Sequence, residues 1–141
     1  MIYIVRHGET DWNAQEKIQG KMRVPLNKKG RQQAENIANH LKNISIDTFY
    51  VSPLERALET ASIIAKYHPH AVFTKIPELK EQSFGDLEGK LIADIIDMHP
   101  AFDWKKSLHY PDFHPGGGES LHDIHKRISE FAKKISKTSK N

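Results

Sequence analysis

The sequence predicts an α/β fold, a three-layer α/β/α arrangement in which a mainly parallel sheet lies between layers of helices. Short apolar segments rich in β-branched and aromatic residues alternate with segments whose apolar residues recur at helical spacing. This alternation indicates parallel strands joined by helical crossovers. No internal repeat or low-complexity linker interrupts the 141 residues, so we expect a single domain over residues 1–141.

The first half of the chain supplies two of the predicted strands and two helices. Residues 1–5 form a continuous apolar run, which is typical of a strand buried on both faces of a parallel sheet. Residues 27–42 have helical periodicity and begin with an asparagine suited to the N-cap. Residues 48–52 are strand-like, and the proline that follows suits the first turn of a helix over residues 53–67.

The second half continues the alternation less regularly. Residues 71–76 predict a third strand, and residues 91–99 a short helix before an irregular stretch through Tyr110. The proline and three glycines at 115–118 indicate a turn. A long helix is expected to open at Glu119 and Ser120, with an apolar stripe formed by Leu121, Ile124, Ile128, Phe131 and Ile135.

Composition excludes several function classes. The net charge of +3, from 21 lysines and arginines against 18 acidic residues, is too small to indicate nucleic acid as a partner. The absence of cysteine excludes disulfides, a thiolate nucleophile and a cysteine zinc site. We expect no signal peptide, no membrane span and no membrane partner, and a cytoplasmic location.

Residues with chemical potential follow the first predicted strand. Arg6, His7 and Gly8 come directly after it, where ligands of open parallel sheets bind. A neutral imidazole held by a backbone carbonyl can attack phosphorus, and an adjacent guanidinium can neutralise phosphate charge. A surface pair of arginine and histidine is the alternative interpretation.

Arg56 lies in the first turn of the helix that follows the second strand. There its guanidinium and the positive end of the helix dipole can serve one anion, and the topology brings it to the same sheet edge as His7. An ordinary strand-to-helix junction with Arg56 facing solvent is the alternative. Further along, Glu81 offers a carboxyl group that can protonate a leaving oxygen, although an acidic surface loop is the simpler interpretation.

Taken together and in this order, these segments resemble the histidine phosphatase (phosphoglycerate mutase-like) superfamily over nearly the whole chain. The resemblance implies a phosphoglycerate mutase-like fold and a phosphomonoester phosphatase, with the phosphatase branch favoured over true mutases. It rests on Arg6-His7-Gly8-Glu9-Thr10 with Trp12 and Asn13, on Gln19, Gly20, Pro25, Leu26 and Gly30, on Ser52-Pro53-Leu54 with Arg56, Ala57, Thr60 and Ala61, on Glu81 with Phe84, Gly85, Glu88 and Gly89, and on Gly117-Gly118-Glu119-Ser120.

The resemblance also implies residue roles. His7 would become transiently phosphorylated, with the phosphoryl group bound by Arg6 and Arg56. Glu81 would protonate the leaving oxygen and later activate water. Substrate-binding positions would also include Asn13, Gln19 and Gly20. The substrate would be a phosphorylated small molecule, with no cofactor and no metal ion, because the cationic side chains supply the positive charge.

One segment of the family pattern is not found in this sequence. The family continues after the last helix into a buried strand ending in Ser-His-Gly, whose histidine is the pocket's second imidazole. We therefore expect a C-terminally shortened, incomplete domain with activity reduced by on the order of 100- to 1,000-fold or lost, and a homodimer that covers the exposed sheet. The alternatives are a phosphate- or phosphoprotein-binding relic and a shortened form of an ordinary enzyme. Substitute histidines could come from His109, His114, His122 and His125.

Overall fold

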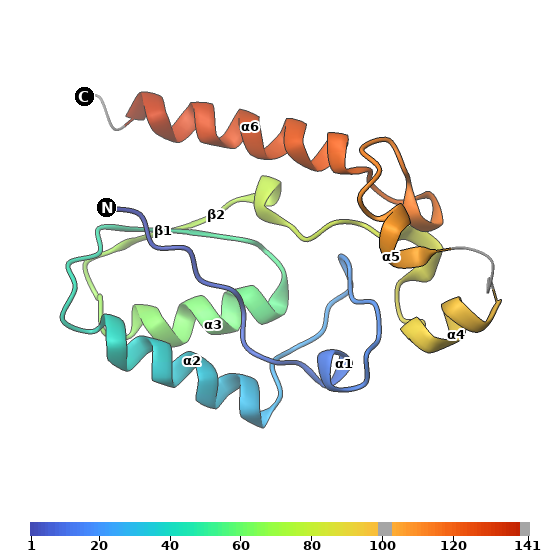
Figure 1. The fold of residues 1–141 in the computed structure, drawn as a ribbon. Coiled ribbons are helices and arrows are strands. Elements are labelled where there is room, and N and C mark those ends of the chain that lie inside the picture. Colours follow the sequence, from blue (N-terminus) through green and yellow to red (C-terminus); the bar gives the residue numbers. More distant parts are fainter. Residues whose placement is uncertain (99–102, 139–141) are drawn as a thin grey trace. The chain divides into compact units, whose positions relative to one another are not determined.

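A computed structural model describes residues 1–98 and 103–138 of the chain (Figure 1). The chain divides into two compact units, which are described separately here. The first unit comprises Met1–Gln15 and Met22–Lys80, and the second comprises Glu16–Lys21 and Glu81–Asn141. The expectation of a single domain stays a prediction.

The first unit contains a parallel pair of strands and two helices. Strands β1 (Thr48–Val51) and β2 (Val72–Lys75) pair in parallel, with Thr48 opposite Val72. Helix α3 (Glu55–Ala65) connects them, and α2 (Lys28–Leu41) packs against α3 on the same side of the sheet (Figure 1). These two strands and two helices are the predicted ones, so the α/β class with a parallel sheet is confirmed.

Helix α2 shows why local sequence suffices for some elements. The Asn27 side chain accepts a hydrogen bond from the Gly30 N–H at 2.8 Å, which caps the first turn as predicted. Ala34 and Ala38 are both 0% exposed and lie one turn apart. Small side chains at this spacing allow α2 to approach α3 closely, so the helical periodicity and the packing agree.

The prediction of a strand at residues 1–5 is wrong for the structure observed. Among the described residues, only β1 and β2 form a ladder, and neither pairs with this segment. Ile2 and Ile4 are 80% and 95% exposed, although they were expected to be buried. A buried parallel strand needs neighbouring strands that bond its backbone, and in the described part of the chain no ladder joins residues 1–5 to β1 or β2.

Two short elements complete the first unit. Helix α1 (Asp11–Ala14), which the periodicity does not predict, opens with a capping box between Thr10 and Asn13. A single antiparallel bridge joins Thr10 to Leu26. A 3-10 turn, η1 (Pro77–Leu79), follows β2.

The second unit is built from four short helical elements, turns and one long helix in its described part. Its elements in order are η2 (Gly85–Leu87), α4 (Ile92–Met98), α5 (Trp104–Ser107), η3 (Pro115–Gly117) and α6 (Leu121–Thr138). The helices α4 and α6 were predicted, although His99 and residues 139–141 lie outside the described residues. Helix α5 falls in the stretch expected to be irregular. The core centres on Ile18 and Ile95, with Phe84, Leu87, Ile92, Leu108 and Phe113 packed against them.

The turn at residues 115–118 is confirmed and has a steric reason. Gly116 has φ +56°, and a Cβ on it would lie 2.4 Å from the Phe84 carbonyl oxygen. This packing joins the turn to the segment around η2. None of the helices in the described part of the chain is long and apolar enough to cross a membrane.

Candidate functional site

The hydrogen bonds of His7 determine its tautomer. Its Nδ1 lies 2.7 Å from the Gly8 carbonyl oxygen, and its Nε2 lies 3.1 Å from the Arg56 Nε. A carbonyl oxygen can only accept, so Nδ1 must carry the ring proton. An arginine Nε–H can only donate, so Nε2 must present its lone pair. His7 is therefore a neutral imidazole whose Nε2 presents a lone pair.

Arg56 is held beside His7 by its own helix and by the loop before α2. It stands in the first turn of α3 and is 1% exposed. One terminal nitrogen donates to the Met22 carbonyl oxygen at 3.2 Å, while Nε faces His7. The structure thus brings together these two sequence-predicted residues, and the alternative of a solvent-facing Arg56 is wrong.

Thr60 joins the two segments that carry His7 and Arg56. Its hydroxyl donates to the Arg56 carbonyl oxygen at 2.8 Å and accepts from the Gly8 N–H at 3.1 Å. The side chain is only 4% exposed. Residue reasoning alone did not single out Thr60. The available signal was its position four residues after Arg56, on the same face of α3.

Gly8 is required by contact with the first turn of α2. A Cβ at Gly8 would lie 2.3 Å from the Gly30 carbonyl oxygen, and a Cβ at Gly30 would lie 2.0 Å from the Glu9 carbonyl oxygen. The missing side chain of Gly8 thus allows a close approach between two segments of the protein's own backbone. Glu9 reinforces it, because its side chain accepts from Asn27 at 3.0 Å and from Lys29 at 2.8 Å. The Lys29 and Asn27 hydrogen bonds lower the pKa of Glu9.

Arg6 and Asn13 are placed differently from His7 and Arg56. Arg6 is exposed and forms no ion pair with any described residue. The Asn13 carboxamide oxygen accepts from the Thr10 N–H at 3.1 Å and from the Thr10 hydroxyl at 3.0 Å. That oxygen therefore caps α1, and only the amide nitrogen of Asn13 is left to donate to a substrate. The roles of both residues stay predictions.

The other expected site residues lie in the second unit. The Glu81 side chain is exposed, and its carboxylate accepts from the Gln82 N–H at 2.9 Å. Gln19 is buried, and Gly20 has φ +49° with Glu88 so close that a Cβ would lie 2.1 Å from its Oε1. Because these residues belong to a different unit from His7, their roles at its site stay predictions.

Glu119 and Arg127 fix the backbone around Glu81. The Glu119 carboxylate accepts from the Ser83 N–H at 3.0 Å and forms a forked pair with Arg127 at 3.1 and 3.2 Å. Arg127 also donates to the Glu81 carbonyl oxygen at 3.3 Å. Burial acts to raise the pKa of Glu119, but the Ser83 N–H, Lys21 and Arg127 outweigh it, and the pKa is lowered.

The four candidate substitute histidines also lie in the second unit. His114 and His122 each have an aspartate near Nδ1, at 3.6 Å for Asp123 and 3.5 Å for Asp112. His109 and His125 are exposed. Among the described residues, no group of three or more histidine and acidic side chains could hold a metal ion.

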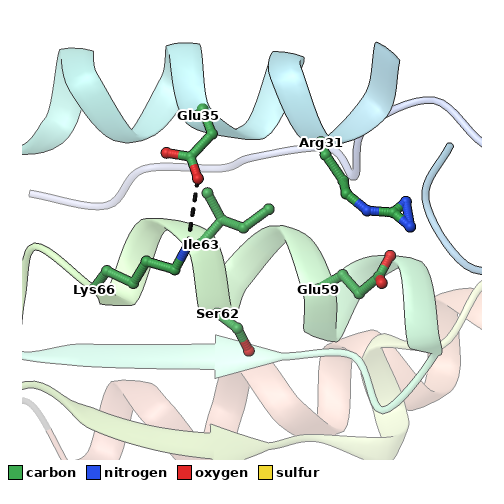
Figure 2. Close-up of a pocket in the computed structure, with 6 residues that line it drawn as sticks. All are labelled: Arg31, Glu35, Glu59, Ser62, Ile63 and Lys66. Atoms are coloured by element: carbon green, nitrogen blue, oxygen red, sulfur yellow. Dashed lines mark hydrogen bonds and ion pairs between the residues drawn. The ribbon is translucent and has the colours of Figure 1, made fainter. Parts of the chain in front are cut away.

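The pocket in Figure 2 lies between α2 and α3, and none of the sequence-predicted site residues lines it. Its volume is about 320 Å³, and its lining residues are Arg31, Glu35, Glu59, Ser62, Ile63 and Lys66. Arg31 donates to the Leu26 carbonyl oxygen, and the Leu26 N–H donates to Glu59 at 2.6 Å. Lys66 and Glu35 pair at 3.4 Å. Arg31 and Glu59 therefore hold the backbone of Leu26 against the two helices, and the Lys66–Glu35 pair links α3 to α2. These charged side chains have a structural role.

Comparison with known proteins gives a consistent set of similarities. A family model described as the histidine phosphatase superfamily (branch 1) matches residues 2–141. Phosphoglycerate mutase-like protein 4 of Arabidopsis thaliana is 40% identical over 136 residues, which cover 95% of this chain and 59% of that protein. The uncharacterized phosphatase PhoE of Bacillus subtilis is 41% identical over 99 residues, which cover 70% of this chain and 51% of that protein.

Solved structures agree with the sequence matches. The mycobacterial glucosyl-3-phosphoglycerate phosphatase complexed with VO3 superposes with a TM-score of 0.87 and 28% identity, covering 94% of this chain and 63% of that one. A further sequence relative, the metal-independent phosphoserine phosphatase of Arabidopsis thaliana, is 36% identical over 147 residues, which cover 99% of this chain and 59% of that protein. The chain therefore spans about three fifths of the length of most of these relatives.

Proposed function

The chain belongs to the histidine phosphatase superfamily, and from this premise we propose that it transfers phosphoryl groups from phosphomonoesters to water through a phosphohistidine on His7. One observation carries the proposal. The Nδ1 contact with Gly8 and the Nε2 contact with Arg56 together keep a neutral imidazole with its lone pair on Nε2. A nucleophile toward phosphorus needs that lone pair, and it needs a cation close to the phosphoryl oxygens.

The first half-reaction forms the phosphoenzyme. The Nε2 lone pair attacks phosphorus, the N–P bond forms, and the P–O bond to the leaving group breaks on the opposite side. The Glu81 carboxyl gives its proton to the leaving oxygen, so the alcohol departs neutral. The proton stays on Nδ1, which still donates to the Gly8 carbonyl oxygen. This hydrogen bond stabilises the positive charge that the ring acquires.

Arg56 changes its partner in this step. In the resting protein its Nε–H donates to the same Nε2 lone pair that must attack phosphorus. An incoming phosphoryl group offers anionic oxygens, which are stronger acceptors than a neutral imidazole nitrogen. The guanidinium then binds those oxygens and releases Nε2. Arg6 is exposed, and in this proposal its guanidinium binds the same oxygens.

The second half-reaction returns the enzyme. The Glu81 carboxylate takes a proton from water, the hydroxide attacks phosphorus, and the P–N bond breaks to release inorganic phosphate. The proposed substrates are phosphorylated small molecules, in keeping with relatives named as phosphoserine and glucosyl-3-phosphoglycerate phosphatases. A metal-independent reaction, a cytoplasmic location, the lack of nucleic-acid or membrane partners and a homodimer stay predictions.

Covalent labelling tests the proposal. Incubation with ³²P-labelled acetyl phosphate should label the chain with a bond that is labile in acid and stable in base, as a phosphoramidate is. His7→Ala should abolish the label, and His70→Ala, in an exposed loop, should leave it unchanged. Glu81→Gln should let the label form and persist, because water is no longer activated.

Other outcomes have definite meanings. Binding of inorganic phosphate without any labelling would identify a phosphate-binding protein without turnover. Labelling that survives His7→Ala would show that another residue is the nucleophile. Loss of the label with a chelator, restored by a divalent metal, would refute the metal-independent mechanism.

A further inference from the structure

The hydroxyl of Thr60 closes a circuit of hydrogen bonds through the nucleophile. Arg56 Nε donates to His7 Nε2, and His7 Nδ1 donates to the Gly8 carbonyl oxygen. The Gly8 N–H donates to Thr60 Oγ1, which donates to the Arg56 carbonyl oxygen. The circuit thus begins at the Arg56 side chain and returns to the Arg56 backbone.

We propose that Thr60 is a positioning residue that fixes the His7 tautomer and the distance between His7 and Arg56, an inference that rests on the function proposed above. The residue does not need to touch the substrate to do so. Its hydroxyl makes two hydrogen bonds at once: it donates its proton to the Arg56 carbonyl oxygen and accepts from the Gly8 N–H. No rotation of the hydroxyl can satisfy both partners in another way.

Burial makes this link strong enough to matter. Gly8 is buried and Thr60 is 4% exposed, so water cannot easily replace either hydrogen bond. A buried N–H that loses its partner costs about 1–3 kcal/mol. The Gly8 backbone would then shift to find a new acceptor, and the carbonyl that holds His7 Nδ1 would shift with it. The next N–H along, from Glu9, is held by the exposed Gln33 side chain at 2.8 Å and offers a weaker restraint.

The consequence for the reaction lies at Nε2. When the Gly8 carbonyl no longer fixes the proton on Nδ1, the imidazole also populates the tautomer with the proton on Nε2. That tautomer has no lone pair for phosphorus and cannot accept from Arg56. The anion-binding guanidinium is also held by Met22, so phosphate binding depends less on Thr60 than nucleophilic attack does.

Two substitutions at one position test the proposal. Thr60→Val keeps the shape of the side chain and removes the hydroxyl, whereas Thr60→Ser keeps the hydroxyl and removes a methyl group. Thr60→Val should slow His7 labelling by acetyl phosphate on the order of 10- to 100-fold. Thr60→Ser should label at close to the wild-type rate. Ser62→Ala, which removes a hydroxyl from the pocket side of the same helix (Figure 2), is the matched control and should have no effect.

A readout that does not need turnover separates this inference from the proposed function. The ¹⁵N shifts of His7 in the full chain should show a protonated Nδ1 and an unprotonated Nε2 in the wild type and in Thr60→Ser. Thr60→Val should show a mixture of tautomers, and its affinity for inorganic phosphate should change much less than its labelling rate. A wild type without turnover but with this tautomer shift would refute the function and keep the positioning role.

Two results would overturn the positioning role. One is a Thr60→Val variant that labels as fast as the wild type with an unchanged tautomer. The other is a wild-type His7 whose proton lies on Nε2, and this measurement remains decisive even if Thr60→Val does not fold.

Discussion

At the scale of single residues, the site depends on groups with only one possible role in a hydrogen bond. The Gly8 carbonyl cannot donate and the Arg56 Nε–H cannot accept, so together they leave His7 with one tautomer. Groups that can both donate and accept a hydrogen bond would not fix the tautomer of His7. The distinction also separates Arg56, which is buried and doubly bound, from Arg6, which is exposed.

Substitution of the two arginines by lysine should therefore have unequal effects. A lysine at position 56 keeps the charge, but its single ammonium cannot face both His7 and the Met22 carbonyl as the guanidinium does. Arg56→Lys should slow labelling on the order of 100-fold, as expected for a lost preorganised donor. Arg6→Lys should cost much less. Equal losses in the two variants, measured with acetyl phosphate at saturating concentration, would contradict this account of Arg56.

At the scale of elements, the Glu81 segment is held by Glu119, just before helix α6, and by Arg127 on that helix. The Glu119 carboxylate accepts from the Ser83 N–H and from two Arg127 nitrogens, and Arg127 also donates to the Glu81 carbonyl oxygen. The pairing was not predictable from sequence periodicity, because Glu119 precedes Leu121, the first residue of the helix, and Ser83 lies in an irregular segment 36 residues away. The match of both segments to family blocks did not predict that they contact each other.

The lowered pKa of Glu119 gives this link a pH dependence. A carboxyl whose pKa is lower in the folded than in the unfolded chain stabilises above its ordinary value of 4.5, and the stabilisation is lost as the pH falls through the folded value. The Ser83 amide should therefore lose protection from hydrogen exchange below about pH 4.5, after correction for intrinsic rates. Glu119→Gln should show weakened protection at neutral pH with no further loss on acidification.

The matched control lies on helix α6, which follows Glu119. Glu130 is exposed, and Glu130→Gln removes an equal charge from α6 without touching the Ser83 segment. That variant should retain the wild-type pH profile of Ser83. Equal protection of the Ser83 amide in the wild type and in Glu119→Gln at neutral pH would show that the Glu119 carboxylate does not hold the segment.

At the scale of the whole molecule, the sequence predicted the two paired strands and the longer helices, but apart from His7 and Arg56 it did not predict which distant residues contact each other. Helix α2 carries its cap and its small-residue face within its own length, so its existence was predictable. The adjacency of His7 and Arg56 was predicted from two parallel strands that end at one sheet edge, and the contact is present although residues 1–5 form no strand. The contact of Thr60 was not predicted, because its bond to Gly8 spans 52 residues and leaves no local pattern. For residues 1–5 the composition predicted burial but could not say which strand would cover them.

The exposed apolar segment at the N-terminus leads to the last prediction. Ile2 and Ile4 are 80% and 95% exposed, and Val72 on β2 is 61% exposed. Segments with unpaired backbone and apolar side chains recruit other chains. We expect this 141-residue chain to self-associate, with a sedimentation coefficient that rises with concentration. Ile4→Lys should suppress the association without lowering the unfolding temperature, because that side chain packs on little. Gln15→Lys adds the same charge at an exposed polar position and should leave association unchanged. A chain that sediments as a monomer at every concentration would mean that these apolar residues are tolerated in water.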